Sequence, residues 1–188
     1  MKRLLSAYLN KFVTMAQHGG KMRLDKQYTI AGTQKLLDIP EDLARSISFG
    51  EFCMYISGVS DACLNEHWRP QWWCLGRNVE FFDHMGQFEN LEETFTLLKE
   101  KFGYVPETDP IKHNLGRSSN ITRFNASVRV PKPYEMLPRQ SLQFKNSGFP
   151  LLERFITPDI ESVVRERYKE DYGLIKSLSA SLPREFPV

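Results

Sequence analysis

The sequence has no long apolar run and almost no net charge. Its longest hydrophobic stretches fall far short of the roughly 20 residues that a membrane-spanning helix needs. The net charge of +2 over 188 residues is too small to predict nucleic acid as a partner, although local arginine and lysine clusters can still bind an anionic small molecule or glycan. With 41% hydrophobic and 26% charged residues, the composition is that of a globular protein without a membrane segment.

Cysteine is scarce as well. Cys53, Cys63 and Cys74 are an odd number at wide spacing, which favours buried or free thiols over a disulfide framework. A bridge between Cys63 and Cys74 would matter only in an oxidising lumen. No set of His, Cys, Asp and Glu has the spacing of a metal site, and no Gly-x-Ser-x-Gly sequence indicates a hydrolase.

Amphipathic helices dominate the pattern of the first part of the chain. Apolar residues at helical spacing predict a helix over residues 2–17. Ser48 and Glu51 have the spacing of a capping box, which predicts a second helix directly after Ser48. Residues 20–47 are polar and lack a clear period, so we expect a solvated connection with at most a short helix near residues 33–37.

The rest of the chain predicts two strands and two further helices. Residues 79–88 begin with Val79, Phe81 and Phe82 around a single charged residue, Glu80, and are expected to form a strand in a sheet that is covered on both faces. Capped amphipathic helices are expected over residues 90–102 and over residues 157–174, with a frayed tail over residues 177–188. Prolines interrupt residues 106–150, which we expect to form a long loop or insertion with a short strand near residues 126–130.

Two polar clusters contain the residue types of a group-transfer site. Arg3 and Ser6 lie three residues apart on the first predicted helix, so they share a face where a guanidinium and a hydroxyl can bind a phosphate. His67 and Arg69 lie in a loop that Pro70 keeps out of a helix. The imidazole could take a proton from an acceptor hydroxyl, and the guanidinium could steady a developing negative charge. A solvated helix face for the first pair and structural roles for the second are the alternatives.

Three stretches resemble one family. Residues 3–12 resemble the second half of the Arg-x-Pro-x-x-Arg-x-x-Ser motif with which type-2 sulfotransferases bind the 3′-phosphate of their donor, 3′-phosphoadenosine 5′-phosphosulfate. The His-Trp-Arg-Pro-Gln loop within residues 65–71 and the strand-to-helix run at residues 86–93 are similar to the same family. That family includes carbohydrate sulfotransferases and bacterial relatives. The resemblance also makes Arg117 and Ser118 second candidates for phosphate contacts.

The resemblance implies an α/β fold, the P-loop-NTPase-like three-layer sulfotransferase fold with a mostly parallel sheet. The first strand and the phosphosulfate loop of that fold are expected to be missing, because the chain has no Lys-x-Gly-Ser/Thr sequence. The implied organisation is a single, partial domain over residues 1–188. The implied reaction uses 3′-phosphoadenosine 5′-phosphosulfate and no metal, and it moves a sulfuryl group to a hydroxyl acceptor, expected to be a carbohydrate. Arg3 and Ser6 would hold the 3′-phosphate, and His67 and Arg69 would lie near the acceptor.

A different class of function stays open at this point. A truncated or degenerate relative could bind an anionic or sulfated glycan without catalysis, and the absent phosphosulfate loop favours that alternative. The first residues are basic, but no apolar region with a cleavage site follows, so we expect no secretion signal. The localisation therefore depends on the source. We expect a soluble chain, cytoplasmic if it is bacterial and in the Golgi lumen if a missing N-terminus carries an anchor.

Overall fold

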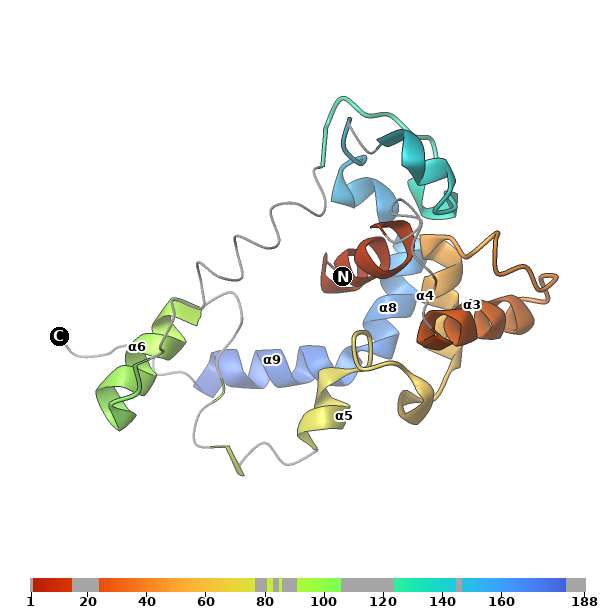
Figure 1. The fold of residues 1–188 in the computed structure, drawn as a ribbon. Helices are drawn as coiled ribbons and strands as arrows, with labels where there is room; N and C mark the ends of the chain where they lie inside the picture. Colours follow the sequence, from red (N-terminus) through yellow and green to blue (C-terminus); the bar gives the residue numbers. More distant parts are fainter. Residues whose placement is uncertain are drawn as a thin grey trace. The chain divides into compact units, whose positions relative to one another are not determined.

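The structure is a computed structural model of the 188-residue chain. It describes residues 2–14, 24–76, 81–82, 85, 91–105, 124–144 and 147–181, which are mainly helical (Figure 1). The chain forms two compact units. The first consists of Met1–Pro70 and Ile121–Tyr168, and the second of Gln71–Asn120 and Lys169–Val188.

The first unit is built around helix α4, which spans Phe49–Gly58. This helix contacts the largest number of other elements in the unit, namely α1 (Lys2–Tyr8), α3 (Leu24–Leu36), α8 (Pro158–Arg167) and the 3₁₀ turn η5 (Pro133–Glu135). Helix α1 continues as a π-helix, η1 (Leu9–Thr14). Three more 3₁₀ turns complete the described elements of the unit: η2 (Asp61–Cys63), η6 (Gln140–Phe144) and η7 (Leu152–Phe155).

The core of the first unit is aromatic. Tyr8 and Phe12 of the N-terminal helix meet Phe52 of α4 with ring centroids 5.7 Å and 5.5 Å apart. Trp68 contacts the same Phe52 ring edge-on at 5.3 Å. All four side chains are buried, and such ring pairs stabilise a core beyond the area that they bury. The N-terminal helix and the segment around Trp68 are therefore held against one shared helix.

The two predicted helix starts in this region are confirmed. Helix α1 and its π-helical extension cover the predicted helix as far as Thr14, and residues 15–17 lie outside the described residues. At the start of α4, the Ser48 hydroxyl accepts a hydrogen bond from the Glu51 N–H at 3.2 Å, and the Glu51 carboxylate accepts one from the Ser48 N–H at 2.8 Å. Both bonds of the predicted capping box are present.

The expectation of an irregular connection over residues 20–47 is wrong, because Leu24–Leu36 form the 13-residue helix α3. The buried face of this helix is largely polar, whereas Leu24 and Tyr28 point to solvent, with Tyr28 73% exposed. Its buried polar side chains are those of Lys26, Thr29, Thr33 and Gln34. An apolar stripe at helical spacing is consequently missing, and with it the signal that hydrophobic periodicity provides.

The described part of the predicted insertion is mostly loop and 3₁₀ turn, but the short strand expected at residues 126–130 is absent. The side chain of Asn125 prevents it by forming a local turn, in which Asn125 Oδ1 accepts from the Ser127 N–H at 2.9 Å. An isolated parallel β-bridge instead joins Phe124 to Phe149.

The C-terminal helix begins as predicted and then breaks. The Thr157 hydroxyl accepts a hydrogen bond from the Ile160 N–H at 3.2 Å, which caps α8. The expected continuous helix through residue 174 is wrong, because α8 ends at Arg167 and a new helix, α9 (Lys169–Ser181), begins after Tyr168. The backbone of Tyr168 leaves the helical region there, with φ −106° and ψ 22°. Helix α9 also shows that residues 177–181 are helical rather than frayed.

The second unit contains α5 (Gln71–Leu75), α6 (Leu91–Phe102) and α9 within its described residues. Helix α5 packs against α9. The Asp171 carboxylate of α9 accepts hydrogen bonds from the N–H groups of Gln71 and Trp72, at 2.9 Å and 2.8 Å, and so caps α5. Helix α6 ends at Phe102, as predicted, and the following Gly103 has a φ of +66°. The predicted cap at Asn90 lies outside the described residues.

The predicted sheet is not seen in the residues that the structure describes. Of the strand expected at residues 79–88, Phe81, Phe82 and Met85 are described, and they are not in a strand. Phe81 is 84% exposed, which does not fit a strand that is covered on both faces. The other residues of that strand lie outside the described residues, so the parallel sheet stays a prediction, as does the single domain over residues 1–188.

Candidate functional site

The candidate phosphate clamp, Arg3 and Ser6, lies on the exposed face of α1. The opposite face of the same helix is buried, with Leu5 and Tyr8 at 0% and 1% exposure. Because the buried face fixes the rotation of the helix, it also fixes the direction in which the other face points. The structure therefore puts Arg3 and Ser6 together on one accessible helix surface, as the spacing predicts.

A buried hydrogen bond attaches this helix to the chain segment before α4. The Tyr8 hydroxyl donates to the carbonyl oxygen of Ile47 at 2.9 Å. Burial, reinforced by the nearby Glu51 carboxylate and Cys53 thiol, raises the pKa of Tyr8 well above its usual value. The hydroxyl consequently keeps its proton and remains a donor, which holds the clamp helix in place.

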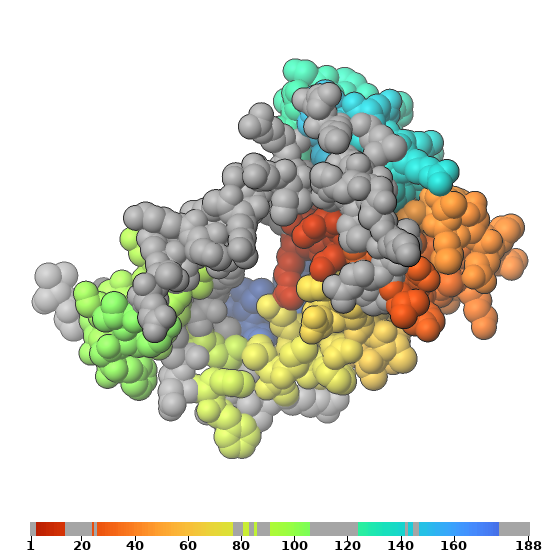
Figure 2. Space-filling model, viewed as in Figure 1, coloured from red at the N-terminus to blue at the C-terminus, as the bar shows by residue number. Residues whose placement is uncertain are grey.

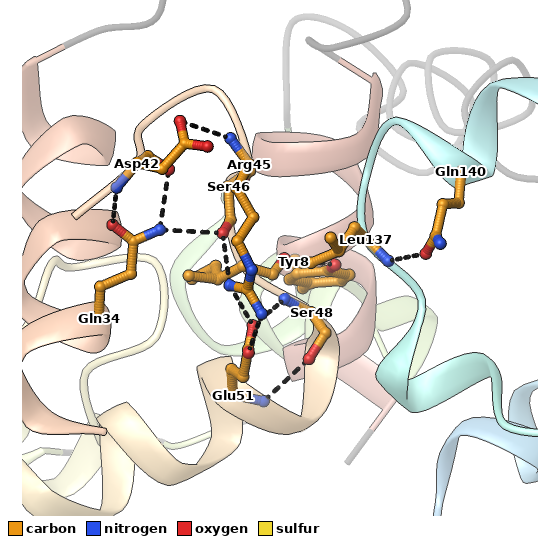
Figure 3. Close-up of polar contacts among 10 residues, drawn as sticks. Tyr8, Gln34, Asp42, Arg45, Ser46, Ser48, Glu51, Leu137 and Gln140 are labelled. Atoms are coloured by element: carbon orange, nitrogen blue, oxygen red, sulfur yellow. Dashed lines mark hydrogen bonds and ion pairs between the residues drawn. The ribbon is translucent and has the colours of Figure 1, made fainter. Parts of the chain in front are cut away.

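A polar network next to Tyr8 orders the segment between α3 and α4 (Figure 3). The buried Gln34 amide donates to the carbonyl oxygen of Asp42 at 2.8 Å and accepts from the Asp42 N–H at 2.9 Å. Arg45 pairs with Glu51, with Nη2 and Oε1 2.5 Å apart. Burial opposes the charge of Glu51, but hydrogen bonds from Arg45 and Ser48 outweigh it and lower the pKa of this carboxyl. These polar residues support the core rather than forming an open site.

The second candidate cluster lies in residues 59–69, called here the His67 loop, which follows α4 at the surface of the first unit (Figure 2). The His67 side chain is exposed, and the backbone N–H of His67 donates to Asn65 Oδ1 at 3.0 Å within a tight turn. The next residue, Trp68, is 2% exposed and packs its ring against the core. The turn thus presents the imidazole at the surface while its neighbour is anchored inside.

Arg69 points back to the backbone of its own loop. Its Nε and Nη2 atoms donate to the carbonyl oxygen of Leu64 at 3.0 Å and 2.5 Å, and Nη2 also lies 3.3 Å from the carbonyl oxygen of Ala62. The sequence predicts His67 and Arg69 as a pair, and the structure does place them in one turn. It gives the Arg69 guanidinium backbone acceptors, which is the arrangement of a loop brace.

Local pattern reading missed two contributors to this site, both at the end of α8. Arg167 donates to the carbonyl oxygen of Val59 at 2.9 Å and forms an ion pair with Asp61. Tyr168 donates its hydroxyl proton to the carbonyl oxygen of Trp68. These partners are separated by about a hundred residues in the sequence, so no local spacing could reveal them.

The remaining predictions from the sequence concern a second pair of phosphate contacts and metal binding. Arg117 and Ser118 lie outside the described residues. The described residues contain no group of three or more His, Cys, Asp or Glu side chains placed to hold a metal ion.

The three cysteines are free thiols. Cys53 is buried, and burial raises the pKa of its thiol to about 12, which makes it unreactive at neutral pH. Cys63 and Cys74 are exposed. Within the described part of the chain, no helix combines the length and the apolar character that a membrane crossing requires.

Comparison with known proteins gave one match. A model of the sulfotransferase family matches residues 1–174, which include the candidate clamp residues on α1 and the whole His67 loop. Neither the curated proteins nor the solved structures gave a match. The family match therefore covers most of the chain, including the whole first unit and, in the second unit, residues 71–120 and 169–174.

Proposed function

We propose that this chain, which belongs to the sulfotransferase family, transfers a sulfuryl group from 3′-phosphoadenosine 5′-phosphosulfate to the hydroxyl group of a carbohydrate. Family membership supports sulfotransferase activity in general terms. The choice of donor follows from the resemblance of residues 3–12 to the 3′-phosphate motif. The choice of a carbohydrate as the acceptor follows from the wider resemblance to carbohydrate sulfotransferases.

The observation that carries the proposal is the accessible pairing of Arg3 and Ser6 on a helix whose other face is buried. A guanidinium can bind a phosphate through charge-assisted hydrogen bonds, and a hydroxyl one turn away can add another. Because Leu5 and Tyr8 hold α1 in the core, little ordering is needed before binding, which favours affinity. Arg117 and Ser118 remain second candidates for contacts with the donor.

The acceptor would meet the donor near His67. In the proposed step the acceptor oxygen attacks the sulfur atom, and the bond from sulfur to the bridging oxygen of the phosphosulfate breaks. Adenosine 3′,5′-bisphosphate leaves with that electron pair. The neutral imidazole of His67 takes the proton from the attacking hydroxyl as the general base. The exposed position of His67 beside the buried Trp68 supports this role.

The role proposed for Arg69 is structural, whereas His67 is the proposed base. Its contacts with the carbonyl oxygens of Ala62 and Leu64 support a role in shaping the loop, so that any effect on the reaction would pass through His67. Charge stabilisation by Arg69 itself would require these contacts to be exchanged for contacts with the substrate.

Calorimetric titration with adenosine 3′,5′-bisphosphate tests the donor site. The full chain should bind, and the Arg3→Ala/Ser6→Ala variant should bind at least about 10-fold more weakly, since hydrogen bonds to a charged group are worth roughly 1.5–3 kcal/mol. The matched control is Ser127→Ala/Arg129→Ala, which removes the same residue types from exposed positions elsewhere in the first unit. Equal affinity in all three proteins would contradict the clamp.

The same titration can be repeated with a sulfated glycan. Glycan binding by a folded chain that does not bind the bisphosphate would favour the non-catalytic alternative, a module that recognises an anionic glycan. Bisphosphate binding that depends on Arg3 and Ser6 would favour the enzyme.

A further inference from the structure

We propose that Arg167 and Tyr168 are positioning residues that hold the His67 loop and thereby fix the place of His67. The part of this inference that concerns catalysis rests on the proposed function. The part that concerns the order of the loop does not, because it follows from contacts within the first unit alone.

The two residues hold the loop at its two ends. Arg167 contacts the beginning of the loop through the carbonyl oxygen of Val59 and the carboxylate of Asp61. Tyr168 contacts the end of the loop through the carbonyl oxygen of Trp68, the residue directly after His67. A segment tied to one helix end at both of its termini has little freedom to shift relative to the rest of the unit.

The burial of the Arg167–Asp61 pair distinguishes it from an ordinary surface ion pair. The two side chains are only 16% and 18% exposed. Two residues earlier on the same helix, Arg165 pairs with Glu161, and those side chains are 63% and 45% exposed. Exposed pairs contribute little because water and salt screen them, whereas breaking a partly buried pair leaves an uncompensated charge. Asp61 and Arg167 should therefore remain together in the folded protein.

The interior of the loop is braced as well. The Arg69 guanidinium donates to the carbonyl oxygens of Ala62 and Leu64. The backbone N–H of Arg69 donates to the carbonyl oxygen of Asn65 at 2.9 Å. With the backbone fixed before and after it, His67 is confined to its side-chain rotamers, and its ring lies beside that of Trp68 with the centroids 6.3 Å apart. A group that acts on a bound substrate benefits from this restriction, because supporting contacts hold it near one geometry.

The loop is also fixed relative to the phosphate clamp. The Trp68 ring contacts Phe12 at a centroid distance of 5.9 Å, and Phe12 lies in the π-helix that continues α1. The same Trp68 provides the carbonyl oxygen that Tyr168 binds. Tyr168 thus secures the residue through which the His67 loop rests on the clamp-bearing helix.

The test compares three variants of the full chain: Tyr168→Phe, Arg167→Gln and the matched control Arg165→Gln. Tyr168→Phe removes one hydroxyl and keeps the ring, so it should fold even if Arg167→Gln does not. The first readout is amide hydrogen exchange of residues 59–69. Loss of one hydrogen bond should speed exchange there by about 5-fold or more, and the control should leave it unchanged. Unchanged exchange in Tyr168→Phe would overturn the inference.

The second readout separates positioning from general stability. In Tyr168→Phe, kcat for sulfuryl transfer should fall by about 10- to 100-fold, while the KM for the donor and the affinity for adenosine 3′,5′-bisphosphate stay as in the parent. Arg167→Lys should recover part of the kcat lost in Arg167→Gln, since an ammonium group can still reach one of the two oxygens. Faster loop exchange with unchanged kcat would overturn the catalytic part. If the parent transfers no sulfuryl group, the proposed function fails, and exchange alone still decides whether the anchors hold the loop.

Discussion

Replacing Tyr8 by Phe tests whether one buried hydrogen bond secures helix α1, which bears the candidate phosphate clamp. Tyr8 is 1% exposed, and its hydroxyl donates to the carbonyl oxygen of Ile47, a residue with 0% exposure. The bond joins residues 39 positions apart, so it links α1 to the segment that leads into α4. The substitution removes the hydroxyl oxygen and keeps the ring that packs against Phe49 and Phe52.

The substitution leaves the carbonyl oxygen of Ile47 without its hydrogen-bond donor, and this loss sets the expected change in stability. A typical hydrogen bond contributes about 1 kcal/mol to stability, and a buried acceptor left without its partner costs roughly 1–3 kcal/mol. Water is not expected to replace the lost donor, because the Ile47 side chain and the Tyr8 ring are both buried. Since the ring remains, the packing loss is small, and we expect Tyr8→Phe to lower the free energy of unfolding by about 1–2 kcal/mol.

Urea denaturation followed by circular dichroism measures this effect. The midpoint should fall while the slope of the transition stays constant, because the surface exposed on unfolding hardly changes. Tyr28→Phe is the matched control, since Tyr28 is 73% exposed and its variant should stay within about 0.5 kcal/mol of the parent. Equal midpoints for the two variants would refute the reasoning.

Three further predictions concern helix ends. Glu51→Gln should lower stability by about 1–2 kcal/mol at pH 7. Hydrogen bonds from Arg45 and Ser48 outweigh burial and lower the pKa of Glu51 from its ordinary value, so in urea titrations the difference from the parent should shrink as the pH falls from the ordinary pKa of a glutamate through the lowered one. Thr157→Ala removes the cap of α8 and should lower the urea midpoint by an amount equivalent to about 1 kcal/mol, whereas Thr157→Ser should not. Gly103→Ala forces an L-residue to φ +66°, at about 1 kcal/mol, and should speed amide exchange at the end of α6; unchanged exchange would contradict that account.

Features that depend on neighbouring residues were predictable from the sequence. The capping box at Ser48 and Glu51, the Thr157 cap and the end of α6 at Gly103 all appear at the predicted positions. Each depends on side chains or backbone angles within a few residues, so the sequence contains the whole signal.

The two main incorrect predictions, the irregular connection over residues 20–47 and the continuous C-terminal helix, have a common cause. Helix α3 buries Thr33 and Gln34, and Gln34 stabilises the loop that follows by bonding to Asp42. The break between α8 and α9 lies at Tyr168, whose hydroxyl binds Trp68. In both places distant or polar contacts decide the structure, and hydrophobic periodicity does not report such contacts.

The exposed side chains of the candidate site were predictable from the sequence, but the contacts that hold the His67 loop in place were not. The spacing of Arg3 and Ser6 and the composition of the turn at His67 identify the exposed side chains. The contacts from Arg167 and Tyr168 come from the far end of the first unit's sequence. Only the folded chain brings them to the loop.

The most direct test of the account is transfer of a radiolabelled sulfuryl group from 3′-phosphoadenosine 5′-phosphosulfate to a panel of glycans by the purified full chain. The account predicts label on at least one carbohydrate hydroxyl, with transfer strongly reduced in Arg3→Ala/Ser6→Ala and in His67→Ala, and retained in Ser127→Ala/Arg129→Ala. A folded chain that binds the donor and labels no acceptor, or transfer that is unaffected by either site variant, would contradict it.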